Sequence, residues 1–292
     1  MPAPSATLLS RSAFTELAND LRRARRTPVS RETRALRGTE LVREGLVVAM
    51  GEGPAEPGLA GGASTDPGIP LPYSLSHSAD RGDGWTARNH RFGVDVHGST
   101  SMTHIDALDH FSWDAMPPIL DGSLAELSTG LVSRGVLLDV PALTGRPVEP
   151  GHVISLAQVH EAFDRHRVQL RPGDALYVNL GRTGTRRSDL ALGAEPVAGL
   201  SIECAAWLAD AHPSVVVSDA GLDADPSEVE GLPVPWHLLL LTVLGIPLVD
   251  MAQLGRLAET CRRLGRWEFL STIAPLPIPA SSGSPVNPLA VF

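Results

Sequence analysis

Two histidines and an aspartate lie close together in the segment MTHIDALDHF, residues 102–111. Neutral imidazole and carboxylate groups are ligands that suit Zn²⁺ or Mn²⁺. If the segment is an extended strand, His104 and Asp106 point to the same face and can contact one ion. His110 lies four residues further on and needs a bend or a helical turn to join them. The alternative is an ordinary polar cluster at the end of a strand.

Two more polar residues interrupt apolar sequence further along the chain. His237 begins the segment HLLLLTVLG, and Asp250 follows the apolar run IPLV. A buried carboxylate costs free energy unless it is paired or bound to a metal. The alternatives are a core histidine bonded to a carbonyl group, and an aspartate that caps the next helix. Together with the first segment, these residues are typical of an active site built at strand ends.

Other catalytic motifs are missing from the sequence. No G-x-G-x-x-G segment opens a helix, no phosphate-loop spacing occurs, and no G-x-S-x-G segment is present. The two cysteines, Cys204 and Cys261, both fall in predicted helices. They provide neither a disulfide framework nor a cysteine zinc site.

The composition limits the class of protein. Hydrophobic residues make up 43% of the 292 residues, all 24 basic residues are arginine, and the net charge is −9. An acidic chain of this kind is not expected to bind nucleic acid. The longest apolar stretch, residues 238–249, is too short to span a bilayer. We therefore expect a cytoplasmic protein with no membrane partner, and the arginine bias suggests a bacterial source.

Residues 1–44 are predicted to form an N-terminal helical arm. Its arginine-rich stretch LRRARR indicates a solvent- or subunit-facing helix, or else a patch for an anionic ligand or nucleic acid. Residues 51–72 are rich in Gly and Pro and predict a long loop, either a lid or binding loop or a mobile insertion.

The remaining chain, residues 45–292, alternates between predicted strands and helices, which indicates a single α/β domain. Strands are expected within 92–98, 135–143, 171–181, 214–221, 246–251 and 267–278. Helices are expected at 155–166, 201–211, 235–245 and 252–265.

The segment THIDALDHF resembles the H-x-G-T-H-x-D-x-P-x-H signature of the metal-dependent "cyclase" family, which includes bacterial kynurenine formamidase and isatin hydrolase. The resemblance continues in the same order as the family's other segments, from about residue 73 to the end. The matching segments are GLVSRGVLLDV, RPGDALYVNLGRTG, AGLSIECAAWLAD, SDAGLDADPS, PWHLLLLTVLGIPLVDMAQL and APLPIPASSGSPVNPLAVF. The resemblance implies a compact α/β domain with a small β-barrel-like core, a mixed sheet and helices outside.

The same resemblance implies one or two Zn²⁺ or Mn²⁺ ions and a homodimer or homotetramer. His104 and Asp106 match metal ligands, and His110 matches the histidine that transfers protons. His237 matches a ligand or near-ligand with a part in catalysis, and Asp250 stands where the family has Glu or Gln near the metal.

The sequence also departs from the signature. The first histidine of the signature is Thr100 here, its glycine is Met102, and its proline is Leu108. His97 could replace the missing ligand, the site could hold one weakly bound ion, or the site could have lost its metal. As contacts to a substrate we expect four further residues: Thr100, Trp113, Asp219 and Trp236.

These features predict an enzyme, with two alternative reactions. The first is an arylformamidase-like, metal-dependent hydrolysis of a small amide, cyclic amide, formamide or lactone. The second is a cyclase or dehydratase reaction of secondary, polyketide-type metabolism with an altered or absent metal site. A metal-free binding protein with a decayed site is a third possibility, from a different functional class.

Overall fold

The computed structural model describes residues 8–52, 73–80, 85–93, 96–97, 102–117, 122, 124–182 and 196–292. Two features predicted above lie outside this part of the chain: Thr100, and the Gly/Pro-rich loop from residue 53 onward. No helix within the described part is long and apolar enough to span a bilayer.

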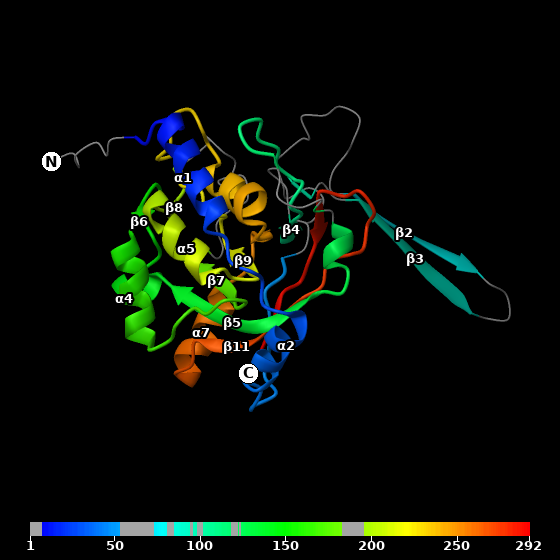
Figure 1. The fold of residues 1–292 in the computed structure, drawn as a ribbon. Coiled ribbons are helices and arrows are strands. Elements are labelled where there is room, and N and C mark those ends of the chain that lie inside the picture. The colour runs from blue at the N-terminus through cyan, green and yellow to red at the C-terminus, as the bar shows by residue number, and fades with distance from the viewer. Residues whose placement is uncertain are drawn as a thin grey trace.

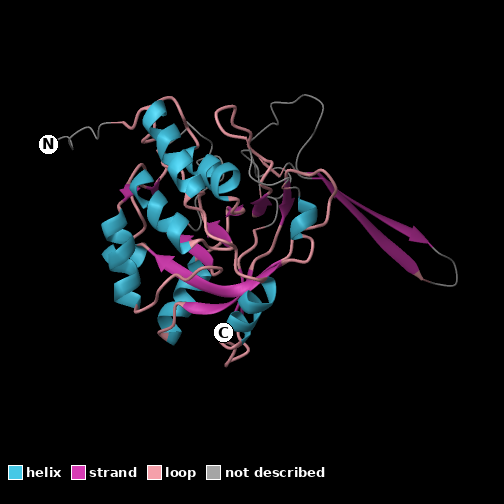
Figure 2. Ribbon diagram, in the orientation of Figure 1, coloured by secondary structure: helices cyan, strands magenta, loops and turns pink. Residues whose placement is uncertain are grey.

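A nine-stranded mixed sheet forms the centre of the molecule (Figure 2). Its strands, in spatial order, are β1 (Val47–Ala49), β13 (Leu289–Val291), β11 (Glu268–Ile273), β5 (Leu131–Asp139), β7 (Ala175–Asn179), β9 (Val215–Ser218), β10 (Leu248–Asp250), β4 (His104–Asp106) and β12 (Gly283–Pro285). The central strands β5, β7, β9 and β10 are parallel, and every other neighbouring pair is antiparallel. The predicted α/β class with a mixed sheet is confirmed.

Helices surround this sheet (Figure 1). They are α1 (Arg11–Arg23), α2 (Arg31–Thr39), α3 (Pro141–Thr144), α4 (Leu156–His166), α5 (Ala205–Ala211), α6 (Pro235–His237) and α7 (Gly255–Leu264), with the 3-10 turns η1 (Leu124–Leu127) and η3 (Ile202–Cys204) and the π-helix η4 (Leu238–Leu244). Serine caps start several of them. At α4, Ser155 accepts a hydrogen bond from the backbone of Gln158, whose side chain bonds back to Ser155.

The parallel strands are apolar on both faces, because helices cover both sides of the sheet. Alternate residues of β7 show this: Leu176 and Val178 face one apolar cluster, and Ala175 and Tyr177 face the other. Helices α1, α4 and α5 contribute to the first cluster and α7 to the second. Phe14 of α1 is completely buried, so the predicted N-terminal arm contributes to the same core as the domain.

One sequence prediction of local structure was wrong in its bounds. Of the strand expected at 92–98, residues 92–93 are the end of β3 (Thr86–Gly93), which pairs with β2 (Tyr73–Asp80), and residues 96–97 form a bend. This hairpin projects from the body of the molecule (Figure 1). The helix expected at 235–245 is present, as α6 followed by the π-helix η4, which ends at Gly245. Every residue of η4 is buried, so no polar face revealed the helical period. A short parallel pair, β6 (Val153–Ile154) with β8 (Gly199–Leu200), was also not predicted.

Candidate metal centre

Strand β4 holds two of the predicted ligands between two neighbouring strands. His104 is paired with Asp250 of β10, and Asp106 is paired with Gly283 of β12. The strand lies in the interior, where His104 is 5% exposed and Asp106 is 1% exposed. Because alternate residues of a strand share a face, the two side chains lie side by side, as the sequence predicted.

Two groups of potential ligands meet at Asp106. In the first, Oδ1 of Asp106 lies 3.2 Å from Nδ1 of His97 and 3.4 Å from Nε2 of His104. In the second, Nε2 of His237 lies 3.6 Å from Oδ2 of Asp106 and 3.3 Å from Oδ2 of Asp250. In each group of three, the ligand atoms lie within 4.8 Å of one another. The carboxylate of Asp106 is therefore shared between the two groups.

The donor atoms of these groups fit a divalent metal ion. Nδ1 of His97, Oδ1 of Asp106 and Oδ1 of Asp250 are buried and have no hydrogen-bond partner among the described residues. Buried polar atoms in proteins are nearly always hydrogen-bonded, so converging unpaired atoms indicate a missing ligand. Imidazole nitrogens together with carboxylate oxygens are the donors that Zn²⁺ and Mn²⁺ accept.

Hydrogen bonds behind the cluster orient two of the imidazoles. The backbone carbonyl of Met102 lies 2.8 Å from Nδ1 of His104 and accepts a hydrogen bond from it, which leaves Nε2 facing Asp106. A carboxylate oxygen of Asp223 bonds Nδ1 of His237 and leaves its Nε2 facing Asp106 and Asp250. Metal-binding histidines commonly have such a partner on the other ring nitrogen, because it fixes the tautomer and the ring orientation.

The charges in the cluster shift several pKa values. Burial opposes ionisation of Asp106, but the imidazoles of His104 and His97 beside it hold its pKa well below the ordinary value. Burial likewise opposes the charged form of His237, while Asp223 and then Asp250 raise its pKa well above the ordinary value. Asp106 is consequently ionised at neutral pH, as a metal ligand must be.

His110 lies beside the cluster but outside both groups of ligands. Its ring stacks on that of His97, with centroids 3.7 Å apart and an interplanar angle of 12°. Phe111 contacts both His110 and His237, with ring centroids 4.5 Å and 5.2 Å apart. Burial lowers the pKa of His110 to about 4, so its imidazole is neutral at physiological pH.

Gly283 provides the space in which His97 lies. A Cβ atom at this position would come within 2.5 Å of Cε1 and Nε2 of His97. The hydroxyl group of the neighbouring Ser282 lies 3.3 Å from Nε2 of the same imidazole. Strand β12 thus makes room for His97, and the residue that precedes the strand contacts the outer nitrogen of the imidazole.

Three of the four expected substrate contacts have partners elsewhere in the structure. Trp236 is 1% exposed and donates from its indole nitrogen to the carbonyl of Leu200 at 2.7 Å, which favours a role in the core. Asp219 accepts hydrogen bonds from the backbone of Leu180 and Arg182. Trp113 packs against Phe14 of α1, with ring centroids 5.6 Å apart. Thr100 lies outside the described residues.

The sequence interpretation missed Asp223 and gave a wrong alternative for Asp250. Asp223 is 6% exposed and also accepts a hydrogen bond from the backbone of Trp236 at 2.6 Å. The signal for it was a carboxylate in the segment LDADPS, in the loop that follows the buried strand β9. Asp250 is not a helix cap, because α7 begins after Leu254.

Several solved structures share this fold, all at low sequence identity. A structure described as a novel cyclase matches with a TM-score of 0.73 and 20% identity, over 93% of this chain and 95% of that chain. Isatin hydrolase A from Ralstonia solanacearum matches with a TM-score of 0.60 and 18% identity, over 85% and 92%. A structure described as a potential metal-dependent hydrolase with cyclase activity matches with a TM-score of 0.50 and 18% identity, over 84% and 98%. These matches define the fold as that of cyclase-type α/β proteins.

The sequence places the chain in the same group. A family model for cyclases, described as "Putative cyclase", matches residues 69–224, which is more than half of the chain. The chain belongs to this cyclase family, and the resemblance seen in the sequence is confirmed. No curated protein matches the sequence significantly. Membership of the family supports an enzyme of the hydrolase or cyclase type.

Proposed function

We propose that this protein is a metal-dependent hydrolase of a small amide, cyclic amide, formamide or lactone. The observation that carries the proposal is the convergence of two groups of metal-ligand atoms on the buried carboxylate of Asp106. The descriptions of two proteins of similar fold, an isatin hydrolase and a potential metal-dependent hydrolase, agree with it. At their low identity these similarities support the fold, so the reaction is argued from the residues.

The residues His97, His104 and Asp106 would hold one ion, and Asp106, His237 and Asp250 would hold a second. His97 supplies the imidazole that the signature has at the position of Thr100, since its Nδ1 lies beside Asp106. A bound Zn²⁺ or Mn²⁺ ion supplies Lewis-acid chemistry at a carbonyl group and makes water more acidic. Asp223 acts behind His237 as a positioning residue.

His110 is the residue we assign to proton transfer. Its neutral imidazole can take a proton from the attacking water and return it to the leaving nitrogen or oxygen. The stacked ring of His97 and the edge contact with Phe111 hold His110 next to the ligand cluster. A side chain held in one place beside the reacting groups can transfer a proton without first being reoriented.

Metal analysis and two variants test the proposal. Protein purified without chelator should contain Zn or Mn at near-stoichiometric level, and His104→Ala should lose metal and hydrolytic activity together. His110→Ala should keep its metal and lose about 100-fold or more in kcat against a panel of a cyclic amide, an N-formyl aniline and a lactone. Metal-free wild-type protein, or full turnover by His110→Ala, would contradict the scheme.

The second candidate reaction is a cyclisation or dehydration. It is favoured by the departures from the family signature at Thr100 and Met102. In this reaction the same His110 would remove a proton next to a carbonyl group. Activity that survives complete removal of metal would support this reaction over hydrolysis. A homodimer or homotetramer and a cytoplasmic location remain predictions from the sequence.

A further inference from the structure

Thr103 is a completely buried polar residue directly before the proposed ligand His104. It stands at the threonine of the family signature, and it belongs to neither group of metal-ligand atoms. Its hydroxyl group donates to the backbone carbonyl of Met251 at 2.6 Å and accepts from the backbone amide of Glu52 at 2.8 Å. One side chain therefore joins three segments that are far apart in the sequence.

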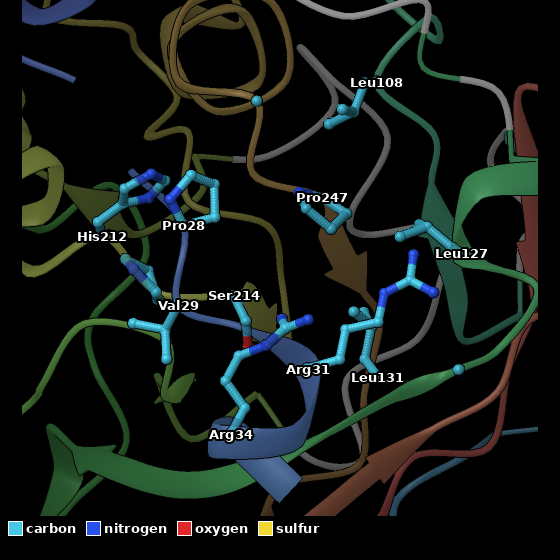
Figure 3. A pocket seen from close by; sticks show the side chains of 14 residues that line it. Pro28, Val29, Arg31, Arg34, Leu108, Leu127, Leu131, His212, Ser214 and Pro247 are labelled. Atoms are coloured by element: carbon cyan, nitrogen blue, oxygen red, sulfur yellow. The ribbon is translucent and has the colours of Figure 1, made fainter. Parts of the chain in front are cut away.

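The residues after Thr103 have different partners. His104 and Asp106 contribute to the ligand cluster. Leu108 lines a separate pocket at the start of α2, which none of the cluster residues lines (Figure 3). Thr103 takes part in neither, because both hydrogen bonds of its hydroxyl group are made to main-chain atoms. Its effect on the site therefore passes through the main chain that it holds.

Met251 is held by this hydroxyl group in an unfavourable backbone conformation. Its φ is 60°, in the left-handed region that residues with a Cβ atom rarely adopt. Such a conformation persists only where surrounding contacts enforce it. The peptide unit that follows Met251 is bonded at both ends: its carbonyl accepts from Thr103, and its amide, on Ala252, donates to the carbonyl of Ser218 at 2.9 Å. These two bonds fix the orientation of the turn.

The turn lies directly beside the proposed ligand Asp250, which is the last residue of β10. Oδ2 of Asp250 lies 3.3 Å from Nε2 of His237, and its buried Oδ1 has no hydrogen-bond partner among the described residues. Aspartate also has one methylene group fewer than the glutamate that the family has at this position. The direction in which its carboxylate points therefore depends closely on the main chain that carries it.

We propose that Thr103 is a positioning residue for the ligand group that contains Asp250. Its hydroxyl group holds the turn at Met251, and this turn directs the carboxylate of Asp250 toward the second ion. The inference rests on the proposed function, since it requires that this group binds metal. It predicts an asymmetry: without the hydroxyl group the second ion is bound more weakly, while the ion bound by the group that contains His97 is retained. Two ligands of that group lie on β4, whose pairing with β10 and β12 does not involve the hydroxyl group.

Stepwise metal titration of the full chain tests this role. Chelator-treated protein is titrated with Zn²⁺ in competition with a fluorescent chelator, which gives an affinity for each bound ion. Asp250→Asn identifies the step that belongs to its group. Thr103→Val keeps the branched shape but lacks the hydroxyl group. It should weaken that step at least about 10-fold, as is usual for partners of metal ligands, and the other step less than about 3-fold. Thr103→Ser keeps the hydroxyl group and should stay within about 3-fold of wild type in both steps.

Ser271→Ala is the matched control for a general loss of stability. It removes a buried hydroxyl group that bonds Tyr177 at 2.7 Å. Ser271 lies on β11, which is separated from β10 by three strands of the sheet. Both binding steps should therefore be unchanged in this variant.

A second substitution tests whether Thr103 acts through the turn. Glycine adopts the left-handed conformation without a steric penalty, so Met251→Gly should recover at least about 3-fold of the affinity lost in Thr103→Val. Unchanged steps in Thr103→Val, an equal loss in both steps, or no recovery with Met251→Gly would each overturn the role of Thr103 while leaving the metal centre in place. Wild-type protein that binds no metal would overturn the proposed function together with this role.

Discussion

Two clusters of buried charged residues in the described part of the chain differ in how completely their polar atoms are hydrogen-bonded. Around Arg134 the charges are fully paired. Its guanidinium donates to both carboxylate oxygens of Asp174 at 3.1 Å and 2.6 Å, to Glu268 at 2.7 Å, and to the carbonyl of Gln169 at 2.6 Å. Around Asp106, by contrast, buried ligand atoms on three residues lack any partner among the described residues. The two clusters are similarly inaccessible, with Arg134 and Asp106 at 5% and 1% exposure.

The difference shows how burial and bonding together distinguish structural from functional charge. The Arg134 network joins β5, β11 and the residues that precede β7, so it links elements far apart in the sequence. A fully satisfied network fixes the packing of such elements. A cluster in which buried polar atoms lack hydrogen-bond partners contributes little to the stability of the fold. A bound ligand can supply the missing partners. Each prediction below changes one side of this contrast.

The largest effect is expected when the paired network is broken. Asp174→Ala leaves Arg134 buried without its bidentate partner, and we expect a loss of about 3–5 kcal/mol in the free energy of unfolding. Urea denaturation measures this loss. The matched control is Arg146→Ala, which breaks an exposed pair with Glu149, with side chains 67% and 63% exposed. It should cost less than about 1 kcal/mol. Similar losses for both variants would show that burial does not determine how much these ion pairs contribute to stability.

Changing the ligand cluster around Asp106 should have the opposite outcome. The protein should lose metal, while its free energy of unfolding should change less than in Asp174→Ala. Asp106→Asn removes the carboxylate that both ligand groups share, so metal affinity should fall at least about 100-fold, or about 2.7 kcal/mol. Competition titration with a fluorescent zinc chelator measures it.

The control for this variant lies on the same segment. Asp109 is exposed, and Asp109→Asn should leave metal affinity unchanged. In chelator-treated protein, Asp106→Asn should lower the free energy of unfolding less than Asp174→Ala does. If Asp106→Asn keeps its metal, the cluster around Asp106 is not a metal centre.

An intermediate effect is expected at Asp223, which bonds the backbone of Trp236 and Nδ1 of the proposed ligand His237. Asp223→Asn keeps the shape of the side chain but weakens the bond that orients the imidazole. Metal affinity should fall about 10–100-fold, as is usual for partners of metal-binding histidines. Asp225, on the same loop, is the matched control, and Asp225→Asn should change metal affinity less than about 3-fold. Equal losses in the two variants would assign the effect to the loop rather than to His237.

Much of the sheet could be predicted because its strands are apolar runs with clear boundaries. The strand around Ala175–Asn179 and the helix capped by Ser155 follow directly from such local signals. The hairpin of β2 and β3 could not be predicted in the same way, since its sequence lacks a continuous apolar face. The helix after His237 was predicted, but its π-helical form was not, because a segment buried on all sides has no amphipathic period from which to measure the helical pitch.

Strand geometry predicts that His104 and Asp106 lie together, whereas the contacts that His97 and His237 make with Asp106 depend on how the whole chain folds. His104 and Asp106 are two residues apart, and strand geometry alone places them on one face. His97 reaches Asp106 through the space left by Gly283, nearly two hundred residues away in the sequence. Asp223 contacts His237 only because the loop after β9 lies against α6. Trp236, by contrast, was expected at the site from residue type alone and is held in the core.

Asp219 provides the smallest and most specific test, because it is a buried carboxylate bonded by backbone amides instead of by a cation. Burial raises its pKa to about 6, although hydrogen bonds from Arg182 and Leu180 oppose the rise. A carboxyl group with a raised pKa binds its proton more tightly in the folded state, so its contribution to stability falls as pH rises from about 4 to about 6. Asp219→Asn removes this titration. The difference in free energy of unfolding between wild type and variant should therefore change by on the order of 1 kcal/mol between pH 4.5 and 6. Denaturant titrations across that range measure it, and parallel pH profiles would show that the backbone amides hold Asp219 ionised throughout.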